Sequence, residues 1–264
     1  MGKIIGICNQ KGGTGKTTTA VNLAAFLALG GEKTLVVDMD PQGNATSGLG
    51  KDLNNEKIEF TVYEALLGED VSDKILPTSW ENLYLLPSSL SLAGAEIELV
   101  GFEDREERLK KFLERIKEKF SFVIIDAPPS LGILTLNVLV ASQSLIIPIQ
   151  CEYYALEGVS KLLKTVELVR KRLNPALEIE GVLLTMADFR TRLTLQVIEE
   201  VKNFFKERTF NTIIPRNVKL AEAPSFGKPI LFYDFQCVGA KAYLNLAQEI
   251  LGRKINVEIL SSLK

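Results

Sequence analysis

A glycine-rich segment near the start of the chain limits the possible folds more than any other feature. Residues 3–9 are an apolar run typical of a buried strand, and residues 16–29 have a helical pattern that a Gly-Gly pair ends. Residues 11–18 (KGGTGKTT) connect the two. Glycines in such a loop let successive backbone N–H groups point inward, and the helix that follows adds its dipole. The sequence therefore predicts a phosphate-binding loop on the first strand–helix connection of an α/β fold.

Apolar runs alternate with helical patterns along the rest of the chain. We expect strands at residues 34–38, 83–86, 122–126, 144–149 and 179–184. We expect helices at about residues 95–120, 132–141, 155–173, 193–206 and 239–251, and a shorter one that a capping box opens at Thr61 and Glu64. Near-continuous apolar strands between helices indicate a parallel sheet covered on both faces. The predicted fold is thus a single doubly wound, mainly parallel α/β domain over residues 1–252, followed by a C-terminal tail over residues 253–264.

The composition narrows the class of protein. With 46% hydrophobic and 24% charged residues the chain has an ordinary globular composition, and no window has the roughly 18 apolar residues that a membrane span needs. The start of the chain lacks a cleavage-like site, so no secretory signal is expected. Cys8, Cys151 and Cys237 stand far apart without CxxC spacing, which indicates free thiols in a reducing compartment. The sequence has no histidine, which excludes acid–base chemistry and metal ligation by that residue.

The loop departs at one position from the general phosphate-loop pattern GxxxxGK[ST], because Gln10 stands where the first glycine is expected. The remaining chemistry is intact, since Lys16 can place its charge on the β- and γ-phosphates and the Thr17 hydroxyl can bind Mg²⁺. The predicted nucleotide contacts come from the loop and the first helical turn: Gly12, Gly13, Thr14, Gly15, Lys16, Thr17 and Thr18. A flexible glycine-rich turn is the alternative, but strand, loop, Lys-Thr-Thr and helix occur in the required order.

Three aspartates follow predicted strands and complete the predicted site. Asp126 ends the strand at residues 122–126, and a phosphate loop needs an acidic residue at such a strand end to hold its magnesium ion. Asp38 and Asp40 come at the end of the strand at residues 34–38. Since transfer of a phosphoryl group to water depends on aligning that water, we assign Asp40 to orienting it and Asp38 to the metal shell. A turn-forming aspartate is the alternative for each of the three.

The second lysine of the loop, Lys11, indicates one family. The form KGGTGKT resembles the deviant Walker A motif of the ParA/MinD group of ATPases. Four further segments resemble the small chromosomal ParA proteins, often called Soj: residues 38–50 (DMDPQGNATSGLG), 124–132 (IIDAPPSLG), 150–158 (QCEYYALEG) and 214–224 (IPRNVKLAEAP). The likeness covers nearly the whole chain, and motifs of this length are far more specific than a phosphate loop alone.

This resemblance implies an ATPase that binds ATP and Mg²⁺ and closes into a homodimer around the nucleotides. Lys11 would reach across that dimer to the partner's phosphates and take part in catalysis beside Lys16, as an arginine finger does. A solvated loop lysine is the alternative reading of Lys11. The resemblance also places Met186, Pro215 and Asn217 around the adenine, although residues 215–217 equally fit a plain exit from a strand.

The family binds DNA without sequence preference once dimeric, and its two implicated basic positions match Arg190 and Lys219. Position 219 is usually arginine in the family, but lysine keeps the charge, which is what contact with phosphates requires. Residues 186–232 contain eight Lys and Arg against five Asp and Glu, a net charge of +3 in a chain of net charge −2. The resemblance therefore implies binding to double-stranded DNA, activation by a ParB-like protein and a cytoplasmic, nucleoid-associated location.

Three other functions fit the residues less well. A MinD-like ATPase that works on a membrane needs a basic amphipathic C-terminal helix, and residues 255–264 (INVEILSSLK) have no basic face, so we expect no stable membrane association. An electron carrier of the nitrogenase-reductase type needs cluster-binding cysteines, which Cys151 alone cannot supply. A DNA-binding module without catalysis would not need the set Lys16, Thr17, Asp40 and Asp126. The cargo of a ParA-like ATPase, whether a chromosome origin, a plasmid or a protein complex, is left open.

Overall fold

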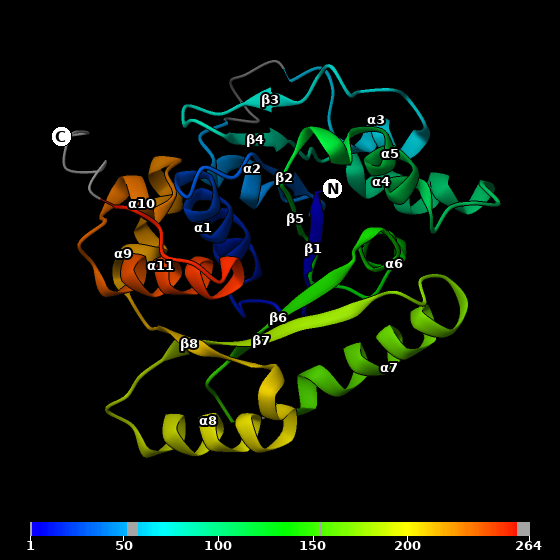
Figure 1. Cartoon of the computed structure of the whole chain (residues 1–264). Helices are drawn as coiled ribbons and strands as arrows, with labels where there is room; N and C mark the ends of the chain where they lie inside the picture. Colours follow the sequence, from blue (N-terminus) through cyan, green and yellow to red (C-terminus); the bar gives the residue numbers. More distant parts are fainter. Residues whose placement is uncertain (1, 52–57, 154, 258–264) are drawn as a thin grey trace.

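The strands of the chain lie side by side in one sheet. The computed structural model describes residues 2–51, 58–153 and 155–257, and within these ranges the sheet has eight strands in the order β3-β4-β2-β5-β1-β6-β7-β8 (Figure 1). All neighbouring strands are parallel except the pair β3 and β4, which is antiparallel. The strands are β1 (Lys3–Ile7), β2 (Thr34–Asp38), β3 (Leu76–Pro77), β4 (Leu83–Leu86), β5 (Phe122–Asp126), β6 (Ser144–Gln150), β7 (Glu178–Ala187) and β8 (Thr209–Pro215).

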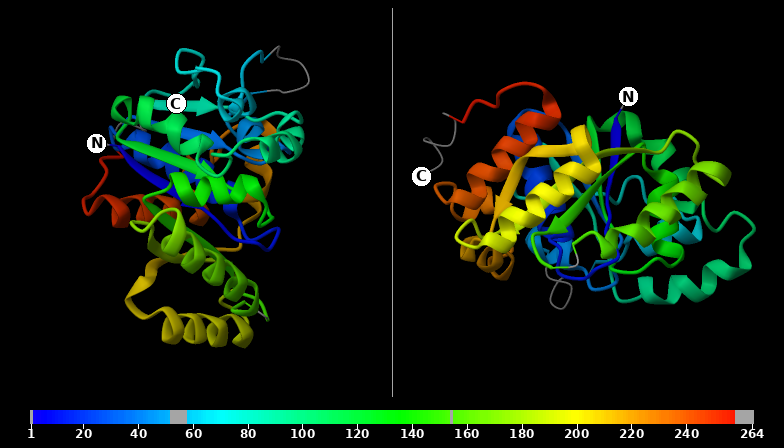
Figure 2. Two further views of the ribbon diagram at one scale, coloured as in Figure 1. Left: turned by 90° about the vertical axis from the view of Figure 1, so that its right-hand side faces the viewer. Right: turned by 90° about the horizontal axis from the view of Figure 1, so that it is seen from below.

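Helices cover both faces of the sheet, as the alternating pattern predicts. Helices α1 and α11 lie on one side of it and α5, α6 and α7 on the other, which the further views in Figure 2 bear out. The helices are α1 (Lys16–Leu29), α2 (Asn44–Gly48), α3 (Val62–Leu67), α4 (Leu92–Glu98), α5 (Arg108–Ile116), α6 (Ile133–Ala141), α7 (Glu157–Arg172), α8 (Arg192–Phe205), α9 (Val218–Glu222), α10 (Ile230–Tyr233) and α11 (Val238–Leu251). Short 3₁₀ turns accompany them: η1 (Leu99–Gly101), η2 (Lys117–Lys119), η3 (Lys206–Arg208) and η4 (Ala223–Phe226).

Each face of the sheet has its own hydrophobic core. One core joins the sheet to α1 and α11, with Phe26 and Tyr243 among its fully buried side chains. The other joins the sheet to α3, α5, α6, α7 and α8, with Leu113 and Leu162 fully buried. Two apolar layers around one parallel sheet are the arrangement of a doubly wound α/β fold, so the predicted fold class is confirmed.

The order of the strands creates a crevice at their carboxyl ends. Strand β1 stands between β5 and β6: strands β2 to β5 fill the sheet on one side of it, and strands β6 to β8 fill the other side. Asp126 at the end of β5 is in register with Ile7 of β1 and with Asp38 of β2. Ligands of open α/β sheets bind at such a point of reversal. The fold therefore brings the glycine-rich loop after β1 next to two of the predicted acidic residues.

One predicted helix is wrong in its extent. The apolar stripe expected over residues 95–120 is divided between α4 with η1 and, after a turn at residues 103–107, α5 with η2. Asp104 in that turn accepts hydrogen bonds from Arg108 and Lys111, so its side chain stabilises the break. On the exposed side of this region Glu107 lies 4.0 Å from Lys111, and Glu106 pairs with Arg105.

Other local predictions agree with the structure. Thr61 and Glu64 form the predicted capping box at the start of α3. Cys8, Cys151 and Cys237 are free thiols, and the first two are buried. Within the described ranges no helix has both the length and the apolar character to cross a bilayer. Most of the predicted tail, residues 258–264, lies outside the described residues, so the division of the chain at residue 252 stays a prediction.

Candidate nucleotide-binding site

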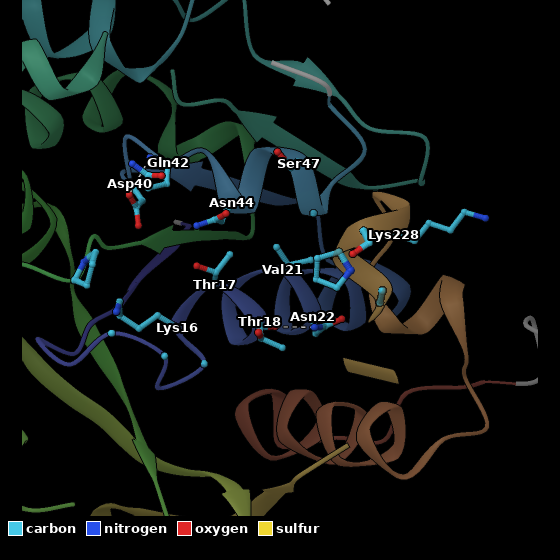
Figure 3. A pocket seen from close by; sticks show the side chains of 18 of the residues that line it. Lys16, Thr17, Thr18, Val21, Asn22, Asp40, Gln42, Asn44, Ser47 and Lys228 are labelled. Atoms are coloured by element: carbon cyan, nitrogen blue, oxygen red, sulfur yellow. Dashed lines mark hydrogen bonds between the residues drawn. The ribbon is translucent and has the colours of Figure 1, made fainter. Parts of the chain in front are cut away.

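A cavity of about 600 Å³ opens at the carboxyl ends of the strands, beside the glycine-rich loop (Figure 3). Most of its lining comes from three segments: the loop with the start of α1, the stretch from the end of β2 into α2, and the wall around η4. Pro129 after β5 and Met186 in β7 complete it. Its lining residues include Gly12, Gly13, Gly15, Lys16, Thr17, Thr18, Asp40, Gln42, Asn44, Ser47, Met186, Ala223, Pro224 and Lys228. The predicted loop contacts therefore gather at one cavity, with Thr14 buried beside it.

The backbone of the loop is shaped to accept an anion. Gly13 and Gly15 adopt left-handed conformations with φ of 71° and 87°, which glycine takes without a steric penalty. Gly15 directly precedes α1, and no described side chain caps the helix at this end. The first N–H groups of a helix have no partner within it, and they carry the positive end of its dipole. The start of α1 can thus donate several hydrogen bonds to a phosphate group.

Lys16 places a cation inside this cavity. Its residue is 6% exposed, and its Nζ atom donates to the carbonyl oxygen of Lys11 at 3.3 Å. Burial lowers the pKa of Lys16, while the nearby Asp126 acts in the opposite direction and favours its charged form. Since the one hydrogen-bond acceptor of its ammonium group among the described residues is a neutral carbonyl, an anionic ligand would further stabilise this desolvated lysine.

The carboxylate of Asp126 is the least satisfied group of the site. It is fully buried, and neither of its oxygens has a hydrogen-bond partner among the described residues. Burial, and next the charge of Asp38, raises the pKa of Asp126 well above its usual range, whereas the nearby Thr17 hydroxyl and Lys16 favour the charged form. A buried carboxylate whose oxygens have no hydrogen-bond partner is a good ligand for a hard cation, and a hydroxyl next to it can supply a further oxygen ligand. Thr17 and Asp126 therefore fit a magnesium ion.

The protein alone does not provide a complete metal cage at this place. Within the described ranges no group of three or more Cys, Asp or Glu side chains is close enough to hold a metal ion. Magnesium is commonly held by one or two protein ligands, with phosphate oxygens and waters completing its octahedral shell. The donor set of one carboxylate and one hydroxyl therefore suits a magnesium ion that arrives with a nucleotide.

Asp38 stands directly beside Asp126 but has partners of its own. Its carboxylate accepts hydrogen bonds from the backbone N–H and the hydroxyl of Thr46, at 2.8 and 2.7 Å, and from the backbone N–H of Asp40 at 3.2 Å. Burial raises the pKa of Asp38 to about 6. These contacts fix the first turn of α2 against the end of β2. Asp38 thus positions the segment that carries Asp40, and its role in the metal shell stays a prediction.

Asp40 faces the cavity from the side opposite α1. Figure 3 shows Asp40 and Gln42 on the loop before α2, across from Thr17 and Lys16. The Asp40 carboxylate accepts a hydrogen bond from the backbone N–H of Gln42 at 3.0 Å, which orients it. A carboxylate held there can accept a hydrogen bond from a water molecule in the cavity, so the predicted water-orienting role is sterically possible and stays a prediction.

Lys11 differs from Lys16 in its surroundings. It is not among the described residues that line the cavity, and its side chain is 44% exposed. Its Nζ atom lies 3.4 Å from a carboxylate oxygen of Glu152, and Arg216 approaches the same carboxylate at 3.8 Å. The first lysine of the loop therefore points to the rim, where a second molecule could meet it. Glu152 was not predicted as part of the site, although it lies in the segment 150–158 that resembles the family.

A second cavity of about 390 Å³ adjoins the first and shares Gly15, Thr18 and Met186 with it. Pro215 and Asn217 line it, together with Ile214, Val218 and Leu220. Met186 takes a left-handed conformation with φ of 53°, which is unusual outside glycine and often occurs at functional sites. The three residues predicted around the adenine thus lie together at one mostly apolar hollow beside the phosphate loop, and their role stays a prediction.

The structure also adds residues that sequence analysis missed. Asn22 in α1 lines the first cavity, and its side-chain oxygen accepts a 2.6 Å hydrogen bond from the backbone N–H of Ile230. The wall around η4 belongs to the site as well, with Pro224 and Ser225 lining it. Asn22 could have been found from the sequence, because it is a polar residue at a buried position of α1. The position of η4 depends on its contacts with α2, which no local sequence pattern reveals.

The two residues predicted to contact DNA lie outside both cavities. Arg190 is in the connection from β7 to α8, and Lys219 is in α9, just after β8. Because β7 and β8 are neighbouring parallel strands, both connections leave the sheet at its carboxyl edge. Each residue forms an ion pair close by in sequence, Arg190 with Asp188 and Lys219 with Glu222.

Known proteins resemble the chain over nearly its full length. A family model described as an AAA domain matches residues 2–179. The chain is 59% identical over 251 residues to the sporulation initiation inhibitor protein Soj of Bacillus subtilis (strain 168), which covers 95% of this chain and 98% of that protein. It is 52% identical over 254 residues to the chromosome partitioning protein ParA of Myxococcus xanthus (strain DK1622), with 96% and 89% covered.

A solved structure has the same architecture. The cobyrinic acid a,c-diamide synthase of Mycobacterium smegmatis with bound ADP and magnesium matches with a TM-score of 0.84 and 37% identity, over 97% of this chain and 98% of that one. One assignment follows from the phosphate loop, from the two strand-end aspartates and from relatives that match nearly the whole chain. This chain belongs to the ParA family of ATPases, among its Soj-type members.

Proposed function

We propose that this protein is a nucleotide-controlled DNA-segregation ATPase. It binds ATP with Mg²⁺, closes into a homodimer around the nucleotides, and in that form binds double-stranded DNA without sequence preference. A ParB-like partner stimulates hydrolysis and so releases the DNA, which moves a chromosome or plasmid over the nucleoid. The observation that carries this proposal is the difference between the two loop lysines, with Lys16 buried in the cavity and Lys11 exposed at its rim.

The buried residues explain how one molecule holds the nucleotide. The N–H groups at the start of α1 and the Lys16 ammonium bind the phosphates, and the hollow at Met186, Pro215 and Asn217 receives the base. Thr17 and Asp126 would hold the magnesium ion, with Asp38 beside them. The ion neutralises phosphate charge when bound. Binding thus satisfies the desolvated Lys16 and Asp126 at the same time.

The exposed position of Lys11 suggests why hydrolysis would need a second molecule. Asp40 orients the attacking water from one side of the cavity, and the chain has no histidine that could act as a general base there. Lys11 of the partner subunit would supply positive charge to the transferring phosphoryl group, which lowers the barrier as an arginine finger does. A slow reaction that starts only in the dimer suits a switch better than a metabolic enzyme.

DNA binding is assigned to the basic residues at the same edge of the sheet. Arg190 and Lys219 lie on the neighbouring β7–α8 and β8–α9 connections, inside the segment of residues 186–232 with its net charge of +3. Two such sets, one from each subunit, would give a dimer a wider basic surface than a monomer has. Contacts of this kind neutralise phosphates without reading bases, and their strength falls steeply with salt.

The test is retention of duplex DNA with ATP, with ADP and without nucleotide. We expect the wild type to bind only with ATP and to lose binding as salt rises, and the double variant Arg190→Ala/Lys219→Ala to lose it throughout. The matched control is Lys164→Ala/Lys171→Ala, which removes two exposed charges from α7 and is expected to bind normally. Equal retention by wild type and the Arg190/Lys219 variant at low salt would remove the DNA assignment.

A further inference from the structure

Both residues assigned to DNA contact are already bound to a carboxylate of the same molecule. The Arg190 guanidinium donates two hydrogen bonds to Asp188, from Nε to Oδ1 at 2.8 Å and from Nη2 to Oδ2 at 2.7 Å. A fork-to-fork contact of this kind is the strongest geometry for an arginine–carboxylate pair. Arg190 lowers the pKa of Asp188 to about 2, so the carboxylate is charged at any physiological pH.

Lys219 is held in a similar way. Its Nζ atom donates to Glu222 at 2.9 Å and lies 5.6 Å from the centre of the Tyr233 ring. The Tyr233 hydroxyl donates to the same Glu222 oxygen at 2.9 Å. The hydrogen bond from Lys219, and next that from Tyr233, holds the pKa of Glu222 below its usual range. Glu222 thus carries a full charge next to Lys219.

In the Asp188 pair the cation is far more exposed than the carboxylate. The Arg190 side chain is 88% exposed, whereas that of Asp188 is 25% exposed. The backbone of Asp188 follows directly after β7, where the N–H of Arg216 donates to the carbonyl oxygen of Ala187 at 3.0 Å. Glu222 is likewise tied to a second element through Tyr233 of α10. When a phosphate draws the cation away, the acid therefore stays behind.

We infer that Asp188 and Glu222 are counter-charges that lower the affinity of this protein for DNA. Each carboxylate forms an ion pair with the cation that a DNA phosphate would contact. Once that cation has moved to the phosphate, the carboxylate leaves a negative charge beside the DNA. This inference rests on the proposed DNA-binding function of Arg190 and Lys219. The two carboxylates make binding weak enough to be reversible for each molecule, which a protein that must release DNA in every cycle requires.

The carboxylates should also change how DNA binding depends on salt. A cation that contacts a phosphate lowers the slope of log K against log[salt] by about 0.9, through released counterions. If the cation leaves a carboxylate to do so, that carboxylate takes up a salt cation and part of the release is cancelled. Removing the carboxylate charge should restore the full release of counterions. DNA binding then becomes both tighter and more dependent on salt.

The experiment measures the affinity for mixed-sequence duplex DNA by fluorescence anisotropy over a range of salt concentrations, with ATP present. Asp188→Asn and Glu222→Gln are each expected to bind roughly three- to tenfold more tightly at low salt, with a slope steeper by up to about 0.9. The control Glu199→Gln changes the net charge equally at an exposed position of α8 and should have a smaller effect on both quantities.

Different results would overturn this inference and the proposed DNA-binding function. Unchanged or weaker binding by both carboxylate variants, with wild type binding DNA through Arg190 and Lys219, would overturn the inference alone, because the carboxylates would then only orient the cations. Failure of the wild type to bind, or normal binding by Arg190→Ala/Lys219→Ala, would overturn the proposed function instead. Thermal unfolding identifies a variant that does not fold, and the two sites test the inference independently.

Discussion

Asp126 illustrates how a single residue can serve ligand binding at the expense of stability. Its carboxylate is buried next to Asp38, and neither oxygen has a described hydrogen-bond partner. An ionised group in this environment destabilises the empty protein, since desolvation is not compensated. A magnesium ion with a nucleotide would remove that cost. The binding free energy of the ligand therefore includes the removal of the desolvation cost that Asp126 causes in the empty protein.

This reading makes a prediction for Asp126→Asn. The neutral amide avoids burying a charge, so the free energy of unfolding of the nucleotide-free protein should rise by on the order of 1 kcal/mol. The same variant should lose the added thermal stability that Mg²⁺ gives the wild type in the presence of ATP. Thermal denaturation with and without Mg²⁺–ATP measures both effects. A less stable empty variant, or one that Mg²⁺ still stabilises fully, would contradict this role of Asp126.

Individual residues of the site were predictable where a short motif places them. Lys16, Thr17 and the loop glycines follow from the order of strand, loop and helix, because the loop must stand at the start of α1. Asp126 and Asp38 follow from strand ends, since the carboxyl ends of parallel strands meet at one edge. Glu152, whose carboxylate is near both Lys11 and Arg216, was missed because it joins segments distant in sequence.

At the scale of elements, apolar strands and most of the long helices were predictable, whereas the division of one long apolar stripe and several very short elements were not. Helix α1 and strands β2, β4 and β5 have the predicted bounds. The apolar stripe over residues 95–120 does not reveal the turn at Asp104, because the residues on both sides of the turn pack into the same core. Strand β3 and helices α2, α9 and α10 have two to five residues each, too few to produce a periodic pattern.

The packing of η4 against α2 connects two walls of the nucleotide cavity. Gly227 follows η4 with φ of 60°, and a Cβ atom there would stand 2.9 Å from the Cα atom of Gly50, just after α2. Such a distance is too short for a real contact, so one backbone would have to move. Since residues of η4 and α2 both line the cavity, a shift at this close approach would move one wall of the site relative to the other.

We therefore predict that Gly227→Ala weakens both the fold and nucleotide binding. Gly252→Ala is the matched control, since Gly252 has φ of 64° and no described atom within 4 Å of its would-be Cβ. The left-handed backbone should cost each variant about 1 kcal/mol, and the contact with Gly50 should cost Gly227→Ala a further 1–3 kcal/mol. Chemical denaturation and nucleotide titration measure the two effects. Equal losses in both variants would show that the glycine–glycine contact is unimportant.

At the scale of the whole molecule, the functional groups share one edge of the sheet. The nucleotide cavity, Lys11 with Glu152, and the connections that carry Arg190 and Lys219 all follow the carboxyl ends of strands. Joining two copies through this edge would cover both nucleotides and bring the two basic segments together. The net charge of −2 for the whole chain keeps the remaining surface from attracting DNA. Nucleotide binding can thus control DNA binding through dimerisation alone.

The central claim is that Lys16 serves its own nucleotide and Lys11 that of a partner. Sedimentation velocity with Mg²⁺ and a non-hydrolysable ATP analogue tests it most directly, on the wild type, Lys11→Ala and Lys16→Ala, with nucleotide binding followed by titration. We predict that the wild type sediments as a dimer, that Lys11→Ala binds the analogue but stays a monomer, and that Lys16→Ala does neither. A Lys11→Ala protein that dimerises like the wild type would contradict the account.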